Sequence, residues 1–292
     1  MKPAPFDYAR PDTVADAVAL LASRPGDCKL LAGGQSLLPM LNFRVVRPAV
    51  LVDIGRLIEL DTQRRTPDGG LELGALTRHR TLESSPVVAG YSPLVPAVMA
   101  HVAHLAIRNR GTLGGSLSHA DPAAELPMLA RLLDARIVAQ SPRGERAIAA
   151  ADFFVAPLTT CLQDDEMVVR VVLPPLPAAA GWAFEEHARR PGDFAMAAVA
   201  VLLPLQQGRV HQPRIAMMGV GDTPLRCPAA EAVLDGQVPD DALIERAAAA
   251  ACAALTPRGD LHASAELRRH LARVLSVRAL TSAWHRARGD TA

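Results

Sequence analysis

The chain has 292 residues, half of them hydrophobic, and its 31 basic side chains nearly balance its 30 acidic ones. This length predicts one large or two modest domains with a sizeable core, and the balanced charge argues against a nucleic-acid or membrane-surface partner. No apolar run is long enough to cross a bilayer, and the N-terminus lacks the apolar centre of a signal peptide. The cysteines are too scattered for a zinc ribbon or an iron–sulfur ligand set and suit a reducing compartment, so we expect a cytoplasmic protein. They are Cys28, Cys161, Cys227 and Cys252.

The first part of the chain, residues 1–56, reads as a small α/β lobe. Residues 13–24 have apolar side chains at helical spacing, and Thr13 is placed to cap that helix. Short apolar runs at residues 29–32 and 50–54 predict two buried strands.

Residues 57–176 predict a second lobe in which an antiparallel sheet is mixed with helices. A turn signal, Pro-Asp-Gly-Gly at residues 67–70, precedes the first strand. The predicted strands occupy residues 71–75, 136–139, 146–148 and 167–173. The predicted helices occupy residues 81–85, 94–105 and 123–133.

A Pro-rich stretch at residues 174–181 is the best candidate for a linker, because such a sequence cannot continue a central strand or helix. It divides the chain into domains 1–176 and 177–292. Strands followed by helices predict an α+β C-terminal domain with a three-stranded antiparallel sheet. The predicted strands are 182–186, 196–203 and 210–218, and the predicted helices are 228–234, 240–254 and 263–286.

Two glycine segments, each entered from an apolar run and left through polar residues, are the main functional signal. Glycine lets the backbone turn tightly and approach a ligand, and consecutive N–H groups can form a concave site for an anion. Neither segment matches the Rossmann fingerprint or the P-loop. Each can be an ordinary turn, but together they can grip one diphosphate from two sides. The candidates are Ala32, Gly33, Gly34, Gln35, Ser36 and Leu37 in the first segment, and Thr112, Gly114, Gly115 and Ser116 in the second.

Polar residues beyond the second segment are further candidates. Asp121 and Glu125 can accept hydrogen bonds from sugar hydroxyls, although Asp121 can equally cap a helix that begins at the following proline. His119 lies near the ligand or is merely exposed. Arg108 and Arg110 can offset phosphate charge, but we favour a surface or interface position for both.

The order of several blocks resembles a known family. The blocks are AGGQSLLP (32–39), DIGRLIEL (53–60), GALTRHRTLESSP (74–86), RNRGTLGGSLSHADPAAELP (108–127), EEHARRPGDFA (185–195) and AELRRHLARVLSVRAL (265–280). In this order they resemble the FAD-binding subunit of the molybdenum hydroxylases. That group includes the medium subunit of carbon monoxide dehydrogenase and the flavin domain of xanthine dehydrogenase. The resemblance covers nearly the whole chain.

The resemblance implies an α+β protein with a two-lobed FAD-binding domain of the vanillyl-alcohol-oxidase/PCMH type and a smaller C-terminal domain. It implies that the two glycine segments hold the FAD pyrophosphate, that Asp121 and Glu125 bind ribose or ribityl hydroxyls, and that His119 lies nearby. It places the turn around residues 189–193 near the flavin ring. Relatives often carry a lysine just upstream, where this chain has Glu185 and Glu186. Because cationic groups near the ring tune the reduction potential of a flavin, the reduction potential of the flavin on this chain cannot be transferred from relatives.

The resemblance also implies a function for the chain, namely an FAD-carrying electron-transfer subunit of a multi-subunit molybdenum hydroxylase or dehydrogenase. Its partners would be an iron–sulfur small subunit with [2Fe-2S] clusters and a molybdopterin large subunit, in a dimer of heterotrimers. Electrons would pass from molybdenum through the clusters to FAD and on to an external acceptor. We expect no metal site and no catalytic side chain on this chain, since the hard chemistry belongs to the cofactors.

Two other functions remain open at this point. One is a free-standing FAD-dependent oxidase or dehydrogenase with its own substrate pocket. The other is a non-catalytic assembly subunit that has lost its cofactor, against which the intact glycine segments count.

Overall fold

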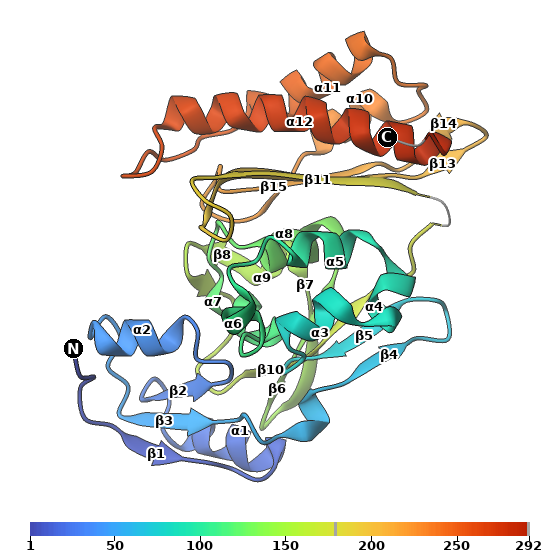
Figure 1. Cartoon of the computed structure of the whole chain (residues 1–292). Helices are drawn as coiled ribbons and strands as arrows, with labels where there is room; N and C mark the ends of the chain where they lie inside the picture. The colour runs from blue at the N-terminus through green and yellow to red at the C-terminus, as the bar shows by residue number, and fades with distance from the viewer. Residues whose placement is uncertain (178–179, 291–292) are drawn as a thin grey trace.

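The computed structural model describes residues 1–177 and 180–290 and contains three stacked parts, each built on its own sheet (Figure 1). A small N-terminal lobe lies against one side of a middle lobe. A C-terminal sheet lies against the other side of the middle lobe, with long helices outermost. This mixture of helices and sheets confirms the predicted α+β class.

The N-terminal lobe is a parallel sheet in the order β1-β3-β2, with two helices. As predicted, the side chain of Thr13 accepts a hydrogen bond from the Asp16 N–H and caps the first helix. Because the strands are parallel, the carboxyl ends of β2 and β3 meet at one edge, where the first glycine segment begins. The elements are β1 (Asp7–Ala9), α1 (Val14–Ser23), β2 (Cys28–Leu31), α2 (Leu37–Asn42) and β3 (Val50–Asp53).

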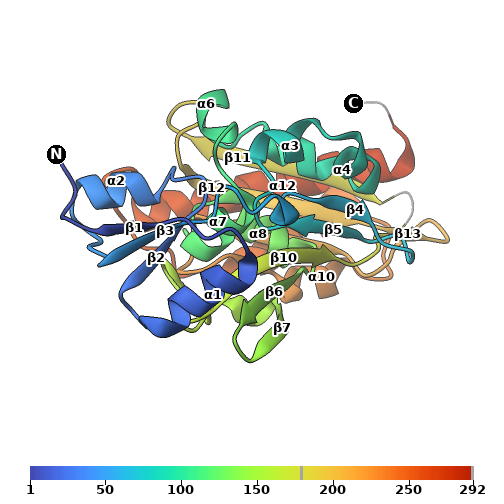
Figure 2. The same ribbon diagram turned by 90° about the horizontal axis from the view of Figure 1, so that it is seen from below.

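The core of this lobe continues into the middle lobe. Val18 and Leu21 of α1 share one buried cluster with Val52 of β3 and with Val138 and Met167 of the neighbouring sheet. The two lobes therefore pack as one unit, seen from below in Figure 2. Their shared boundary holds the glycine segments in fixed relative positions.

The middle lobe is an antiparallel sheet in the order β4-β5-β10-β6-β7 with a row of short helices. After the 3-10 turn η1 (Ile58–Leu60), its strands are β4 (Gln63–Arg65), β5 (Leu71–Gly74), β6 (Arg136–Ser141), β7 (Gly144–Ala149) and β10 (Met167–Leu173). Its helices are α3 (His79–Ser84), α4 (Pro86–Tyr91), α5 (Leu94–Met99), α6 (Leu105–Arg108), α7 (Leu113–His119), α8 (Glu125–Leu132) and α9 (Ala150–Phe153). A small hairpin joins β8 (Phe154–Ala156) to β9 (Thr159–Thr160).

Two helix predictions in this lobe were wrong in part. The run 94–105 is not one helix: α5 ends at Met99, and Ala103 adopts a left-handed backbone conformation before α6 begins. The run 123–133 becomes helical only at Glu125, so Asp121 does not cap α8. Instead, its carboxylate accepts a hydrogen bond from the N–H of Ala123 and forms a tight turn before the helix.

The C-terminal domain contains an antiparallel sheet in the order β11-β12-β15-β16, covered by helices on its outer face (Figure 1). The first two main strands were predicted, whereas the predicted strand 210–218 begins only at Arg214, because Val210 belongs to a separate hairpin. The sheet also has a fourth strand, which at two residues is too short to give a sequence signal. The strands are β11 (Gly181–Ala188), β12 (Ala195–Leu203), β15 (Arg214–Met218) and β16 (Leu225–Arg226), beside a hairpin of β13 (Leu205–Gln206) and β14 (Arg209–Val210). The helices are α10 (Pro228–Leu234), α11 (Asp241–Ala253) and α12 (Ala265–Arg288).

The central strand of this sheet, β12, is buried along its whole length. Ala198 and Leu202 face the core of the middle lobe, whereas Val199 and Val201 face the core under the C-terminal helices. The strand is apolar at every position because it separates two cores.

The predicted linker at residues 174–181 joins β10 to β11, and its residues 178 and 179 lie outside the described part of the chain. No helix among the described residues is long and apolar enough to span a bilayer.

Candidate functional site

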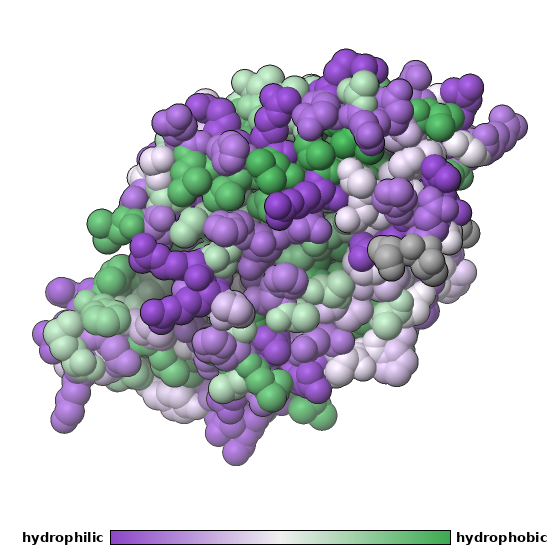
Figure 3. Space-filling view, turned by 45° about the horizontal axis from the view of Figure 1, so that its top comes forward, coloured by the Kyte–Doolittle hydropathy of each residue, from purple (hydrophilic) through white to green (hydrophobic). Residues whose placement is uncertain are grey.

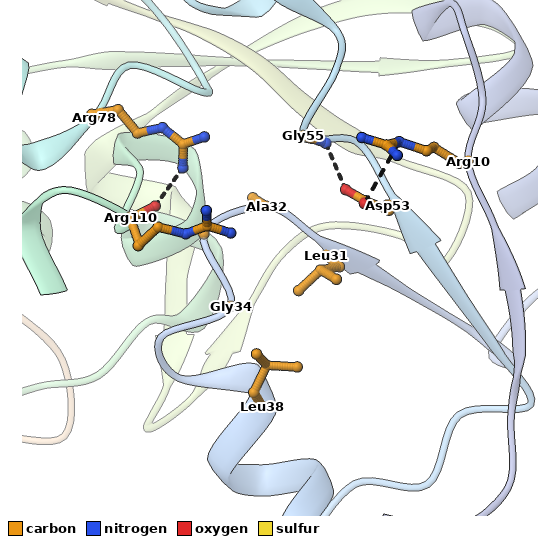
Figure 4. A pocket seen from close by; sticks show the side chains of 10 residues that line it. Arg10, Leu31, Ala32, Gly34, Leu38, Asp53, Gly55, Arg78 and Arg110 are labelled. Atoms are coloured by element: carbon orange, nitrogen blue, oxygen red, sulfur yellow. Dashed lines mark hydrogen bonds and ion pairs between the residues drawn. The ribbon is translucent and has the colours of Figure 1, made fainter. Parts of the chain in front are cut away.

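A cavity of about 210 Å³ lies between the carboxyl edge of the N-terminal sheet and the middle lobe (Figure 4). The first glycine segment forms part of its wall, and charged side chains form much of the remainder. Its lining residues come from both lobes: Arg10, Leu31, Ala32, Gly33, Gly34, Leu38, Asp53, Gly55, Arg78 and Arg110.

The first glycine segment offers free hydrogen-bond donors. Within the described residues, the backbone N–H groups of residues 33–36 donate to no protein acceptor. Gly34 has a φ of +75°, a left-handed conformation that favours glycine. Ser36 occupies the N-cap position of α2 but its side chain makes no capping hydrogen bond, so its hydroxyl is also free. Leu37 is the first residue of α2 and does not line the cavity.

The second segment is different, because it is the first turn of helix α7 rather than a loop. The N–H of Gly114 donates to the Ala75 carbonyl, that of Gly115 to the Thr112 hydroxyl, and that of Ser116 to the Thr112 carbonyl. These N–H groups are therefore not available to an anion, although Gly115 itself is exposed. In this segment, a ligand can contact the half-buried side chain of Ser116 and the backbone surface of Gly115.

Tight packing brings the two segments together. A Cβ atom on Gly33 would lie 2.3 Å from the carbonyl oxygen of Arg110 and 2.9 Å from the Cα of Gly111. A Cβ atom on Gly115 would lie 3.9 Å from that of Ala32. The absence of a side chain at Gly33 is therefore what allows the two lobes to approach each other, whereas the Gly115–Ala32 distance would be an ordinary van der Waals contact.

Three arginines surround the cavity, opposed by a single carboxylate. Arg10 lies 3.9 Å from the carboxylate of Asp53, which also accepts a hydrogen bond from the N–H of Gly55 at 2.8 Å. Arg78 donates to the carbonyl of Arg110 from the other side. The excess of guanidinium groups favours an anionic ligand.

Sequence reasoning missed part of this charge arrangement. Arg10, Arg78 and Asp53 are isolated in the sequence, and only the fold brings them together. Arg110 is exposed, as a surface position requires, and it also lines the cavity. Arg108 has a structural role: it pairs with Glu83 at 2.9 Å and donates to two main-chain carbonyls.

The remaining predicted residues lie in and after α7, and two of them, Asp121 and Glu125, are close to the C-terminal domain. His119 lies in the last turn of α7, and the Pro122 carbonyl beyond Asp121 accepts a hydrogen bond from the N–H of Gly219. Glu125 is buried at the start of α8, and this burial raises its pKa to about 7, with the charge of Asp121 adding to the effect. None of these side chains lines the 210 Å³ cavity.

The β11–β12 turn extends from the C-terminal sheet toward the middle lobe (Figure 1). A Cβ atom on Gly192 would lie 2.9 Å from the carbonyl oxygen of Ala103, so this turn packs closely on the bend between α5 and α6. Phe194 is 70% exposed beside it. Figure 3 shows that the surface is hollowed where the N-terminal lobe meets the remainder of the molecule.

Comparison with known families covers both parts of this architecture. Residues 4–176 match the FAD binding domain in molybdopterin dehydrogenase, and residues 182–283 match the CO dehydrogenase flavoprotein C-terminal domain. The chain belongs to the FAD-binding subunits of the molybdenum hydroxylases. The family resemblance seen in the sequence is therefore confirmed, and this FAD subunit is part of an oxidoreductase.

Full-length relatives support the same assignment. The FAD subunit is 43% identical over 289 residues to the 6-hydroxypseudooxynicotine dehydrogenase complex subunit alpha of Paenarthrobacter nicotinovorans, covering 99% of this chain and 97% of that protein. It is 36% identical to the carbon monoxide dehydrogenase medium chain of Hydrogenophaga pseudoflava, covering 98% and 99%.

Solved structures share the whole fold of this FAD subunit. A structure of carbon monoxide dehydrogenase from Hydrogenophaga pseudoflava matches with a TM-score of 0.95 at 39% identity, covering 98% of this chain and 99% of that one. Quinoline 2-oxidoreductase from Pseudomonas putida 86 matches with a TM-score of 0.93 at 40% identity, covering 99% of each chain. These matches confirm an FAD-binding domain followed by a C-terminal domain, and with them the role of an FAD-carrying electron-transfer subunit.

The residues around the cavity fit the pyrophosphate that links the two halves of FAD. A pyrophosphate carries negative charge and many acceptor oxygens, and it needs donors with room for close approach. The free N–H groups of residues 33–36 and the surplus of arginine provide both.

Proposed function

We propose that this FAD subunit holds the FAD pyrophosphate in the cavity between its N-terminal and middle lobes. The observation that supports this most strongly is the row of free N–H groups at residues 33–36, whose first two residues line the cavity together with Arg78 and Arg110 (Figure 4). Backbone donors bind phosphate oxygens at close range, and the arginines balance their charge. When bound, FAD supplies the electron-accepting chemistry.

We further propose that the second segment guides the cofactor rather than forming a second anion site. Gly115 presents a bare surface next to Ala32, and the hydroxyl of Ser116 can donate to a cofactor oxygen. Thr112 and Gly114 hold this turn in place, because the buried Thr112 caps α7 and the N–H of Gly114 is bonded to Ala75. His119, Asp121 and Glu125 remain our candidates for contacts with the remainder of the cofactor.

The proposed division of labour places substrate oxidation on another chain. We propose that an iron–sulfur small subunit and a molybdopterin large subunit complete the enzyme, in a dimer of heterotrimers. The names of two relatives support this, since one is a complex subunit and the other a medium chain. We also propose a domain boundary near residue 176. We propose a cytoplasmic location, because all four cysteines are free.

Flavin content of two glycine variants tests the placement of the pyrophosphate. Gly34→Val should remove FAD from the purified protein, because Gly34 lies in the free N–H row at a φ of +75°. Gly208→Val is a matched control: its φ is +74°, but its Cβ would meet nothing within 4 Å and it lies in the distant β13–β14 hairpin. We expect Gly208→Val to keep its FAD. Wild-type flavin content in Gly34→Val would show that the pyrophosphate binds elsewhere.

Purification from the native host tests the division of labour. We expect two partners to copurify, one rich in iron and one containing molybdenum, and the isolated subunit to pass electrons to a dye without oxidising a hydroxylase substrate. A chain that purifies alone and turns over a substrate unaided would instead be a free-standing oxidase.

A further inference from the structure

A carboxyl group is enclosed between the C-terminal sheet and the middle lobe. Along β11, Trp182 and Phe184 pack against the core of the middle lobe, whereas Ala183 faces the core under the C-terminal helices. Strand side chains alternate, so Glu186 points toward the middle lobe. Its side chain is only 4% exposed.

Among the described residues, this carboxyl group has no hydrogen-bond partner, and the one basic side chain within 4.0 Å of it is His101. Its Oε2 atom is buried and has no hydrogen-bond partner among the described residues. Its Oε1 atom lies 3.9 Å from Nδ1 of His101, which is too far for a hydrogen bond. His101 packs edge-on against the ring of Phe184, with centroids 5.0 Å apart. A buried carboxylate without a cation is costly, so this group favours its protonated form.

A second buried acid acts on the first. Burial, and to a smaller extent the nearby charge of Glu125, raises the pKa of Glu186 to about 8. Glu125 belongs to the middle lobe and Glu186 to the C-terminal domain, so the pair spans the boundary between them. A negative charge on Glu125 therefore disfavours ionisation of Glu186.

The other charged groups around the pair do not neutralise it. Asp121 precedes α8 and is negative, and Glu185 lies next to Glu186 on β11. Opposite Glu186 in the sheet, β12 is apolar throughout. His101 is the only cationic type of side chain within 4.0 Å of Glu186 among the described residues, and burial lowers its pKa.

We propose that Glu125 and Glu186 form a proton-holding site in this FAD subunit, and that His101 connects it to solvent. His101 suits this role because its side chain is 46% exposed while its ring lies beside Glu186. The inference rests on the proposed function in one respect: Glu125 is a candidate for cofactor contact. Negative charge on bound FAD would favour proton binding by the acids, and the proton would come from solvent on the side where His101 is exposed.

Infrared spectroscopy of the FAD-loaded subunit tests the pair directly. We expect a carbonyl band of a protonated carboxyl group that disappears as the pH is raised from about 6 to 10. Glu186→Gln should move this transition to lower pH, because the buried acid that remains is Glu125, whose pKa is raised to about 7 and not to about 8. Glu166→Gln is the matched control: its side chain is 2% exposed, but Arg146 pairs with it at 2.6 Å and keeps it ionised. The control should leave the band unchanged, and an unchanged band in Glu186→Gln would overturn the proposal.

Proton uptake during reduction provides a second readout. Near pH 8, the wild-type protein reduced by dithionite in weak buffer should take up more protons per FAD than Glu186→Gln. Equal uptake would contradict the coupling to the cofactor. If Glu186→Gln does not fold, Glu125→Gln tests the same pair from the other side. A wild-type chain that shows the band but binds no FAD would refute the proposed function while leaving the proton-holding pair intact.

Discussion

Replacing Gly33 with alanine should weaken FAD binding and destabilise the fold together, because the added methyl group has no room. Its Cβ would lie 2.3 Å from the carbonyl oxygen of Arg110 and 2.9 Å from the Cα of Gly111. Favourable contacts between non-bonded atoms begin near about 3.5 Å, so the two segments must separate by roughly 1 Å. Both obstacles are main-chain atoms, and no side-chain rotation can relieve the clash.

The size of the effect follows from this displacement. Overpacking typically costs about 1–3 kcal/mol of folding free energy. The same shift moves the donors at residues 33–36 away from Arg110, and a loss of about 1.4 kcal/mol in binding is a tenfold weaker Kd. We therefore expect Gly33→Ala to lower the free energy of unfolding, measured in urea, by about 1–3 kcal/mol. We also expect it to weaken FAD binding at least about tenfold, as measured by flavin fluorescence when FAD is added back to deflavinated protein.

Gly90→Ala provides the control for this experiment. Gly90 lies within helix α4, and a Cβ atom there would meet nothing within 4 Å. Alanine should stabilise this helix by about 0.5–1 kcal/mol and leave FAD affinity unchanged. Wild-type stability and wild-type FAD affinity in Gly33→Ala would refute the close approach of the two segments.

Three further outcomes are expected. The double variant Arg78→Gln/Arg110→Gln should bind FAD more weakly than wild type, and the difference should shrink with added salt in fluorescence titrations; equal affinity at low salt would remove these side chains from the site. Burial raises the pKa of Glu125 from 4.5 to about 7. The folded chain therefore binds the Glu125 proton more tightly than the unfolded chain does, and the free energy of unfolding falls as the pH rises from about 4.5 to about 7. Glu125→Gln should flatten this part of the curve of urea midpoint against pH, and an unchanged slope would contradict the burial argument. Glu166→Gln should lower the free energy of unfolding by about 1–3 kcal/mol, because the buried carboxylate accepts hydrogen bonds from Arg146 at 2.6 and 2.7 Å; a change within error would show that the pair contributes nothing.

The sequence predicted the elements that have strong periodic or compositional signals. The helix capped by Thr13 begins where expected, and the apolar run of β12 forms a central strand. The bend between α5 and α6 was missed because residues 100–104 contain neither glycine nor proline to mark it. Helix α7 was missed because its two adjacent glycines have low helix propensity, and the contact with Ala75 overrides that preference.

The candidate site was only partly predictable for a related reason. Gly33 and Gly34 were found because consecutive glycines after a strand are a local signal. Arg10 and Arg78 each stand alone in the sequence, and no local pattern shows that the fold brings both to one cavity. Nor does a sequence reveal that Glu186 is enclosed without a partner, since its burial depends on a lobe formed by distant residues.

Amide hydrogen exchange with and without FAD tests the central claim most directly. The free N–H groups of residues 33–36 should exchange quickly in deflavinated protein and slowly once FAD is bound. The N–H groups of Gly115 and Ser116 should change little, because each is already bonded to Thr112. Unchanged exchange at residues 33–36, with new protection elsewhere in the chain, would contradict the proposed pyrophosphate site.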